Sequence, residues 1–444
     1  MRIVIAGAGE VGTHLAKLLS NENQDIVVID EKREKLAELD ASYNLMTVVG
    51  NPTSFYALRD ARVNGCDLFV AVTPFESKNL VACSIAKSLG AVTTVARISH
   101  YSFMDPANRA TMDRMGVDRL IYPEYLAARE ILTSLEHSWA RNWFELHDGR
   151  IILAGVRIRD NAPLAGMQLK EFASTTNYFH VSAIRRRHQT IIPRGDDRML
   201  AGDVLYITTT RDHVDDLVQL CGKVRRRIKR VLIMGGSKIA IRLVAMARDR
   251  FRFTIIDNDR AMCDKLLEKC PDATVFYGDA RDPEMLQDAG IDECDGFVAL
   301  TPSSEANILT TLTAKEAGIA KSVAEVEDIQ FIPQAEGLGI GSVVNKRLIA
   351  SSTIFQLLLD SDASTSKCLA LTDAEVAELE VKPGAKITRA TVRELNLDRN
   401  MTLAALIRGD LGMLVTGNTQ IQAGDRVLVF CLMGSLHKVE KLFS

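Results

Sequence analysis

The chain opens with a spacing of glycines that is typical of a phosphate-binding turn. A short apolar run at 2–6 leads into six residues with the pattern G-x-G-x-x-G: Gly7, Ala8, Gly9, Glu10, Val11 and Gly12. The first glycine allows a tight turn, the second lets the backbone approach a pyrophosphate, and the third lets the following helix pack closely. The N-terminus of that helix then faces the phosphates with its positive dipole end. The spacing therefore predicts a nucleotide-binding corner.

An acidic residue stands where such a corner uses one. Leucines continue at helical spacing after the glycines, and a second apolar run at 26–29 ends in Asp30. An acid about 20 residues beyond the glycines accepts a hydrogen bond from a ribose hydroxyl, and its charge disfavours the 2′-phosphate of NADP. We therefore expect NAD(H), or the ribose of ATP or ADP, as the ligand. For Lys32 and Arg33, at the next helix start, we expect solvated side chains.

Further polar residues follow the ends of neighbouring strand-like runs. Arg97 ends one run and is the candidate phosphate clamp, while Asn51 and the pair Thr73-Pro74 end two others. Ligands of an open parallel sheet bind outside the carboxyl ends of its strands, so these residues are candidates for the same site. Each also has a structural interpretation, which is a surface ion pair for Arg97 and a helix cap or turn for the others.

The sequence offers no residues for acid–base catalysis beside this corner. A hydride-transferring enzyme needs a proton-transfer group in its substrate pocket. His14 and His100 are the histidines of residues 1–122, and neither has a carboxylate partner that is visible in the sequence. We therefore predict that the protein binds a nucleotide without being an enzyme and has no catalytic residue. An NAD-dependent oxidoreductase is the alternative.

Composition narrows the class of protein further. The 444 residues are 47% hydrophobic and 25% charged, which is ordinary for a globular protein, and the formal net charge of −3 gives no electrostatic footprint for nucleic acid. A gene regulator is disfavoured because no basic recognition helix is present. The eight cysteines have neither C-x-x-C pairs nor histidines at zinc spacing, which predicts core residues of a reducing compartment and no metal. No apolar run approaches the ~18 residues that span a bilayer, so we expect a cytosolic protein.

A tandem repeat organises the whole chain. From residue 229 the opening strand and turn return, and the segment 66–74 returns as 294–302. The turn before the last strand of a small module also recurs, and we expect a purely structural role for it. The matched pairs include Asn51 and Asp279, Thr73 and Thr301, Asn79 and Asn307, and Asp203 and Asp425. The plan is therefore A-B-A′-B′.

The repeated pattern predicts an α/β protein with two Rossmann-like, doubly wound parallel sheets, each followed by a small α+β module. In the first copy, apolar β-rich runs alternate with helical patterns at 2–6, 26–30, 46–49, 68–72, 92–96 and 119–121. The small module then has strands at 151–158, 181–184 and 204–207. The expected boundaries are 1–122 and 229–345 for the nucleotide-binding domains, 123–142 and 346–361 for two crossover helices, and 143–225 and 362–444 for the small modules.

The second copy differs from the first at three positions of the expected nucleotide site. Ser237 replaces Gly9, Ala240 replaces Gly12 and Glu325 replaces Arg97. Two of these changes add side chains where a pyrophosphate would approach, and the third replaces a cation by a repelling carboxylate. We therefore expect two nucleotide sites that are not equivalent, with the first carrying most of the binding.

The duplicated order, the glycine turn, the strand end at 70–74 and the strand at 95–98 together resemble the TrkA family. These are cytosolic regulatory subunits of Trk/Ktr-type potassium uptake systems, built from two RCK (also called KTN) units. The resemblance covers essentially the whole chain and implies a first site formed by Gly7, Gly9, Val11, Gly12, Asp30, Asn51, Thr73, Pro74 and Arg97. It implies a second site formed by Gly235, Ser237, Ile239, Asp257, Asp279 and Thr301.

The resemblance also implies partners and a place in the cell. Members of the family bind NAD(H) or ATP/ADP, assemble into a ring, and gate a membrane potassium transporter subunit of the TrkH or TrkG type. The chain is then expected in the cytoplasm, held at the inner face of the membrane by that transporter. Independently, apolar faces on the helices near 126–135 and 348–358 are not obviously buried by the adjoining domains, which predicts a homo-oligomer.

Overall fold

The computed structural model describes residues 1–20, 24–147, 149–187, 189–359, 365–371, 374–432 and 435–444. The chain forms two compact units that are discontinuous in sequence. The first contains 1–127 and 345–361, and the second contains 128–344 and 362–444. The second copy of the repeat thus contributes a segment to the unit that holds the first glycine turn.

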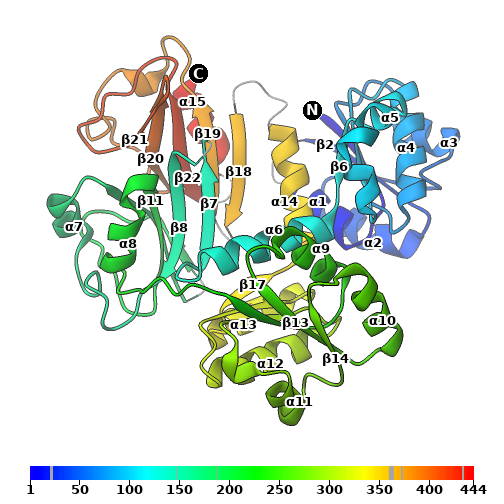
Figure 1. The fold of residues 1–444 in the computed structure, drawn as a ribbon. Helices are drawn as coiled ribbons and strands as arrows, with labels where there is room; N and C mark the ends of the chain where they lie inside the picture. The colour runs from blue at the N-terminus through cyan, green and yellow to red at the C-terminus, as the bar shows by residue number, and fades with distance from the viewer. Residues whose placement is uncertain (21–23, 148, 188, 360–364, 372–373, 433–434) are drawn as a thin grey trace. The chain divides into compact units, whose positions relative to one another are not determined.

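The first unit is built on a parallel sheet with the strand order β3-β2-β1-β4-β5-β6. Figure 1 draws this sheet in blue and cyan, with β2 and β6 labelled. Its strands are β1 (Arg2–Ala6), β2 (Asp25–Asp30), β3 (Met46–Val49), β4 (Leu68–Ala71), β5 (Thr93–Arg97) and β6 (Arg119–Ile121). The helices are α1 (Glu10–Ser20), α2 (Arg33–Ser42), α3 (Phe55–Asp60), α4 (Glu76–Ser88) and α5 (Arg109–Arg114), with 3-10 turns at Tyr101–Met104 and Pro106–Asn108. The expected strands are confirmed to within one residue at each end.

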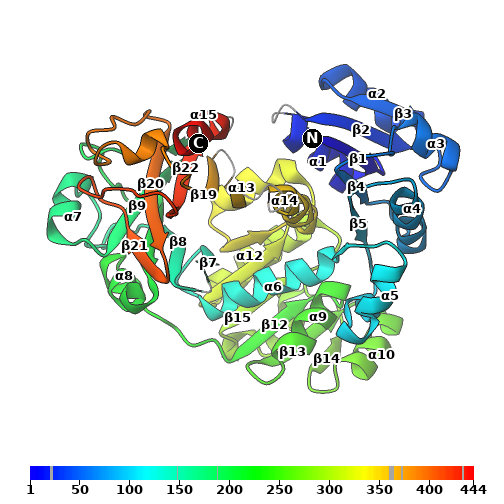
Figure 2. The same cartoon turned by 90° about the horizontal axis from the view of Figure 1, so that it is seen from above.

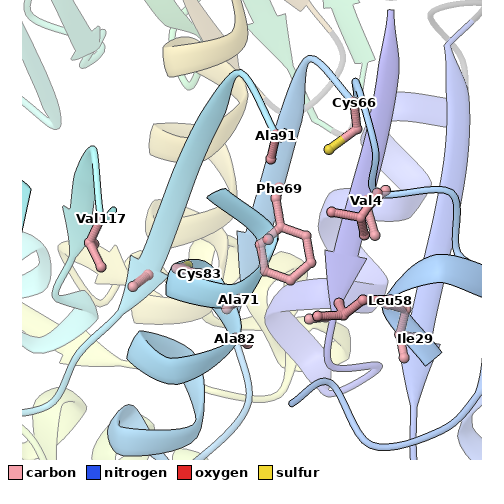
Figure 3. Close-up of a cluster of buried hydrophobic side chains, with 14 of the residues drawn as sticks. Val4, Ile29, Leu58, Cys66, Phe69, Ala71, Ala82, Cys83, Ala91 and Val117 are labelled. Atoms are coloured by element: carbon pink, nitrogen blue, oxygen red, sulfur yellow. The ribbon is translucent and has the colours of Figure 1, made fainter. Parts of the chain in front are cut away.

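The strands of this sheet are continuous apolar runs, as expected for a parallel sheet that helices cover on both faces. On one face, Val4, Ile29 and Phe69 from three neighbouring strands pack with Leu58 of α3 and Cys83 of α4 (Figure 3). All five side chains are fully buried. The cysteines at 66 and 83 lie in this core as free thiols, as the sequence predicted.

A helix from the second repeat completes the first unit. Helix α14 (Lys346–Leu359) packs along α1, and its Ala350 and Ile354 are fully buried. The Ser351 hydroxyl donates a hydrogen bond of 3.2 Å to the carbonyl oxygen of Val11, in the first turn of α1. The crossover helix that follows the second sheet in sequence therefore lies against α1, the helix that follows the first glycine turn.

The second unit contains the repeated parallel sheet, in the corresponding order β14-β13-β12-β15-β16-β17. Its strands are β12 (Arg230–Met234), β13 (Arg252–Asp257), β14 (Thr274–Tyr277), β15 (Gly296–Ala299), β16 (Lys321–Glu325) and β17 (Ser342–Val344). The helices are α9 (Lys238–Ala247), α10 (Arg260–Lys269), α11 (Pro283–Asp288), α12 (Ser304–Glu316) and α13 (Ile332–Leu338), with 3-10 turns at Ile291–Glu293 and Ile329–Phe331.

The first crossover helix, α6 (Pro123–Glu136), makes the reciprocal exchange. From Ala128 onward it belongs to the second unit, where Figure 2 shows it beside the second parallel sheet. The Ser134 hydroxyl donates to Ser342 Oγ at 2.9 Å, and Leu135 packs against Gly296. The sequence-based reason for an oligomer is therefore weakened, because Ile131 and Leu135 of α6 and Ile354 of α14 are buried within the chain.

Each small module is an antiparallel sheet, with matching orders β10-β9-β11-β8-β7 and β21-β20-β22-β19-β18. The first contains β7 (Asn142–Leu146), β8 (Ile151–Arg157), β9 (Phe179–Arg186), β10 (Gln189–Ile191), β11 (Val204–Thr210), α7 (Leu169–Thr175), the 3-10 turn Arg211–His213 and α8 (Val214–Leu220). The second contains β18 (Thr365–Leu371), β19 (Ala374–Glu380), the 3-10 turn Lys386–Thr388, β20 (Met401–Arg408), β21 (Leu411–Leu414), β22 (Arg426–Leu432) and α15 (Leu436–Phe443).

In each module an arginine pairs with a buried aspartate of the turn before the last long strand. Arg186 donates two hydrogen bonds of 2.9 and 2.8 Å to Asp203, and Arg408 donates two of 2.8 and 2.7 Å to Asp425. The turn before the last strand is thus structural, as expected. The neighbouring Arg185 pairs with Glu336 at 2.8 Å.

Candidate functional site

In the glycine turn of the first copy, the backbone requires glycine at two positions, and the third glycine has open space beside it. Gly7 has φ +114°, a left-handed conformation that favours glycine. A Cβ atom on Gly12 would lie 1.9 Å from the carbonyl oxygen of Gly7, so a side chain there is excluded by the turn itself. A Cβ atom on Gly9 would meet nothing within 4 Å. The protein's own packing thus does not require glycine at position 9, whereas a closely approaching phosphate does.

Asp30 holds the turn in place from the end of the neighbouring strand. Its Oδ2 accepts a hydrogen bond of 2.7 Å from the backbone N–H of Ala8, and its Oδ1 accepts one of 2.9 Å from Lys32. A carboxylate has about four acceptor positions, so capacity for a ribose hydroxyl is left over. Both Lys32 and Arg33 are exposed, as the sequence predicted.

A buried amide ties together the ends of β4 and β5. Asn79 accepts hydrogen bonds from the backbone N–H of Thr73 at 2.9 Å and from its hydroxyl at 2.6 Å. The Asn79 amide also donates to the carbonyl oxygens of Thr73 and Arg97, at 3.0 and 2.8 Å. Asn79 was not among the predicted site residues, although its recurrence as Asn307 in the second copy could have identified it. Its role is to position the two strand ends.

The remaining predicted residues differ in what their side chains are free to do. Arg97 is partly buried at the end of β5, and within the described residues its guanidinium makes no hydrogen bond or ion pair. Pro74 is exposed. The Asn51 side chain accepts hydrogen bonds from Thr53, at 3.0 Å from the backbone and 2.8 Å from the hydroxyl, so it forms the turn that the sequence offered as its structural interpretation.

Strand register determines which of these residues lie at one edge. β1 lies between β2 and β4, and β5 follows β4, so the glycine turn, Asp30, Thr73 and Arg97 extend from the carboxyl ends of four neighbouring strands. The strand order reverses between β1 and β4, which is where an open parallel sheet binds its ligand. Asn51 follows β3, the outermost strand, and lies further from this point.

One histidine at this edge has a partner that the sequence did not reveal. His100 Nδ1 contacts Glu76 Oε1, while Glu76 Oε2 accepts hydrogen bonds from the backbone N–H groups of Ser99 and His100, at 2.9 and 3.1 Å. Burial opposes ionisation of Glu76, but the hydrogen bonds from Ser99 and His100 outweigh it and lower the pKa of this carboxyl. The expectation that His100 lacks a carboxylate partner was therefore wrong.

The second copy keeps the turn but caps its helix. Asp257 accepts a hydrogen bond of 2.6 Å from the Gly236 N–H, as Asp30 does from Ala8, and Asn307 repeats the amide link to Thr301. Ser237, however, occupies the open position of Gly9, and its hydroxyl accepts a hydrogen bond of 3.4 Å from the N–H of Ala240. One N–H group at the start of α9 is therefore already satisfied by the protein itself.

Two further residues of the second copy differ from their counterparts Asn51 and Arg97 in the first. Asp279 Oδ1 and Oδ2 accept hydrogen bonds from Arg281, which lowers the pKa of Asp279 through that side chain and the Arg281 backbone N–H. Glu325, in the place of Arg97, is only 3% exposed. The other predicted residues, Gly235 and Ile239, keep the positions of Gly7 and Val11, with φ +97° at Gly235.

The fold and the two glycine turns define a class of protein: a tandem duplication of a Rossmann-like domain followed by a small α+β module. The model of the TrkA-N domain matches residues 3–123 and 231–346, and the model of the TrkA-C domain matches 153–222 and 376–444. The chain belongs to the TrkA family.

Full-length relatives have the same organisation. The chain is 28% identical over 454 residues to the Trk system potassium uptake protein TrkA of Azorhizobium caulinodans, covering 100% of this chain and 98% of the relative. It is also 28% identical over 451 residues to the TrkA protein of Haemophilus influenzae, with the same coverage. The described residues contain no helix that is long and apolar enough to cross a membrane.

Solved structures share the fold. A crystal structure of the GsuK RCK domain matches with a TM-score of 0.61 at 19% identity, covering 100% of this chain and 94% of that one. A structure of the GsuK channel bound to NAD matches with a TM-score of 0.62 at 18% identity, covering 100% and 78%.

Proposed function

We propose that this chain is a regulatory subunit of a potassium uptake system and that NAD(H), or alternatively ATP or ADP, binds mainly to its first glycine turn. The observation that carries the proposal is the difference between two otherwise matching turns. In the first, Gly9 leaves the start of α1 open and Arg97 ends a neighbouring strand. In the second, Ser237 caps the helix and a buried glutamate replaces the arginine.

The family and the comparisons support the wider role. Relatives named as potassium uptake proteins cover the whole chain, and similar folds occur in a channel whose structures include NAD-bound and ADP-bound forms. A bound nucleotide would then bias the conformation of the subunit and so gate a potassium transporter subunit of the TrkH or TrkG type in the membrane. This places the chain in the cytoplasm, at the inner face of the membrane.

Assembly into a ring of several copies is part of the same proposal. The crossover helices give it less support than the sequence suggested, because several of their apolar residues are buried within the chain. Val81 of α4 and Leu309 of α12 stand at matching places in the two copies and are 46% and 63% exposed. Exposed apolar side chains that recur in both repeats suit a contact between copies of the chain. Light scattering at micromolar concentration tests whether the protein is larger than a monomer.

The two turns can be compared by removing the same acid from each. Asp30→Ala removes both the ribose acceptor and the hydrogen bond to Ala8, and we expect the dissociation constant for NADH or ATP to rise by about tenfold or more, because hydrogen bonds to a charged group contribute about 1.5–3 kcal/mol. Asp257→Ala removes the equivalent hydrogen bond to Gly236 and serves as the matched control. Isothermal titration calorimetry should find its dissociation constant within about twofold of the unaltered chain. A large loss in Asp257→Ala would place the binding in the second copy.

The contact between His100 and Glu76 is the observation that favours the oxidoreductase alternative. A histidine beside a carboxylate at the ligand edge is a possible proton-transfer group. On the regulatory proposal, the chain mixed with NADH and a panel of ketoacids should leave the absorbance of the cofactor unchanged. Steady oxidation of NADH that disappears in His100→Ala would instead make the protein an enzyme.

A further inference from the structure

The second repeat places a cation beside the phosphate-binding turn of the first. Arg347, in the first turn of α14, forms an ion pair with Glu10, which is the first residue of α1. One helical turn further along α14, Ser351 hydrogen-bonds both the carbonyl oxygen of Arg347, at 2.9 Å, and that of Val11. These contacts fix the start of α14 against the start of α1.

A cation at this position offsets a negative charge that would oppose phosphate binding. A nucleotide phosphate at the N-terminus of α1 meets the helix N–H groups, but it also meets the carboxylate of Glu10, which is 60% exposed and repels it. Arg347 neutralises that carboxylate. Its own side chain is 28% exposed, and burial lowers the pKa of its guanidinium. A partly buried guanidinium gains more from an incoming phosphate than a solvated one does, because less water has to be removed.

The two copies of the repeat differ in the charges at the positions of Glu10 and Arg347. Helices α6 and α14 begin at Pro123 and Lys346, and aligning these starts superposes Ala127 on Ala350 and Ile131 on Ile354, all fully buried. Glu124 then corresponds to Arg347. At the turn, Lys238 corresponds to Glu10. Both charges are therefore reversed in the second copy, where the crossover helix has the acid and the glycine turn has the lysine. Only for the first turn does the crossover helix supply the cation.

We propose that Arg347 is a ligand for the phosphates of the nucleotide bound at the first turn, and that Glu10 is its partner in the free protein. This inference rests on the proposed nucleotide site. When phosphates arrive, the guanidinium exchanges the carboxylate for phosphate oxygens, to which it can donate two parallel hydrogen bonds.

Calorimetry with Arg347→Ala tests the assignment. The dissociation constants of ATP, ADP and NADH should each rise by about tenfold or more, the range expected for a lost hydrogen bond between charged groups. Adenosine, which has no phosphate, should bind the variant and the unaltered chain equally well. Arg347→Lys keeps the charge but not the bidentate geometry and should recover part of the loss. Arg109→Ala is the matched control, since it removes an exposed arginine of the same unit that pairs with Asp113.

The outcomes separate this inference from the proposed function. If the unaltered chain binds none of these nucleotides, the proposed function fails. If it binds them and Arg347→Ala binds them within twofold of the same affinity, Arg347 is not a ligand. If the variant loses adenosine as strongly as ATP, Arg347 only shapes the turn, and the proposal is again overturned. A thermal melt of each free variant verifies that it is folded.

Discussion

Gly9→Ala is expected to leave the free protein as stable as the unaltered chain and yet to remove most of its nucleotide binding. The added Cβ atom meets no protein atom within 4 Å, and Gly9 does not adopt a left-handed conformation. The methyl group would instead occupy the space through which a phosphate approaches the backbone. We expect the dissociation constants for NADH and ATP to rise at least about tenfold, equivalent to about 1.4 kcal/mol, by calorimetry.

Gly12→Ala provides the contrast for this experiment. Its Cβ atom would lie 1.9 Å from the Gly7 carbonyl oxygen, so the turn must open. Both the melting temperature and the affinity should therefore fall, with a stability loss on the order of 1–3 kcal/mol, as for an overpacked core. Unchanged nucleotide affinity in folded Gly9→Ala protein would mean that the ligand lies elsewhere.

Potassium flux should depend on the nucleotide only while the first turn is intact. Liposomes carrying a TrkH-like or TrkG-like subunit would be assayed with and without this chain, across NAD(H), ATP and ADP. Allosteric coupling of about 1–3 kcal/mol changes populations roughly 5- to 150-fold, so at least one nucleotide should alter flux within that range. Gly9→Ala should abolish this response, because a ligand shifts an equilibrium only by its differential affinity for the two states.

Two results would contradict the regulatory mechanism. One is a flux that is indifferent to every nucleotide although calorimetry detects binding. The other is a Gly9→Ala protein that regulates as well as the unaltered chain. The equivalent change in the second copy, Ser237→Ala, removes only a helix cap and is the control that should preserve the nucleotide response.

The parallel sheets could be predicted from the sequence because their strands carry local signals. Apolar runs followed by glycine, aspartate or threonine recur in both copies, and the strands of the first sheet were expected within a residue of where they lie. The first small module was predicted less completely. Strand β7 and the three-residue β10 were missed, because their residues do not form apolar runs.

The parts of the candidate site that escaped prediction depend on distant pairings. Glu76 and His100 lie on different elements, and nothing in their spacing indicates that β5 brings them together. Arg347 and Glu10 are separated by most of the chain. Asn79 differs, because its exact recurrence in the repeat was visible and only its bonding to the two strand ends required coordinates.

The exchange of crossover helices also constrains how the protein is made. The first sheet and its helices leave the ribosome early, but α14, which covers α1, is synthesised only after the whole second parallel sheet. Domains generally begin to fold in order of synthesis, and a surface that waits for a distant segment remains exposed to aggregation meanwhile. The first unit of a nascent chain therefore lacks α14 until translation is about four-fifths complete, and fragments that end before residue 345 never acquire this helix.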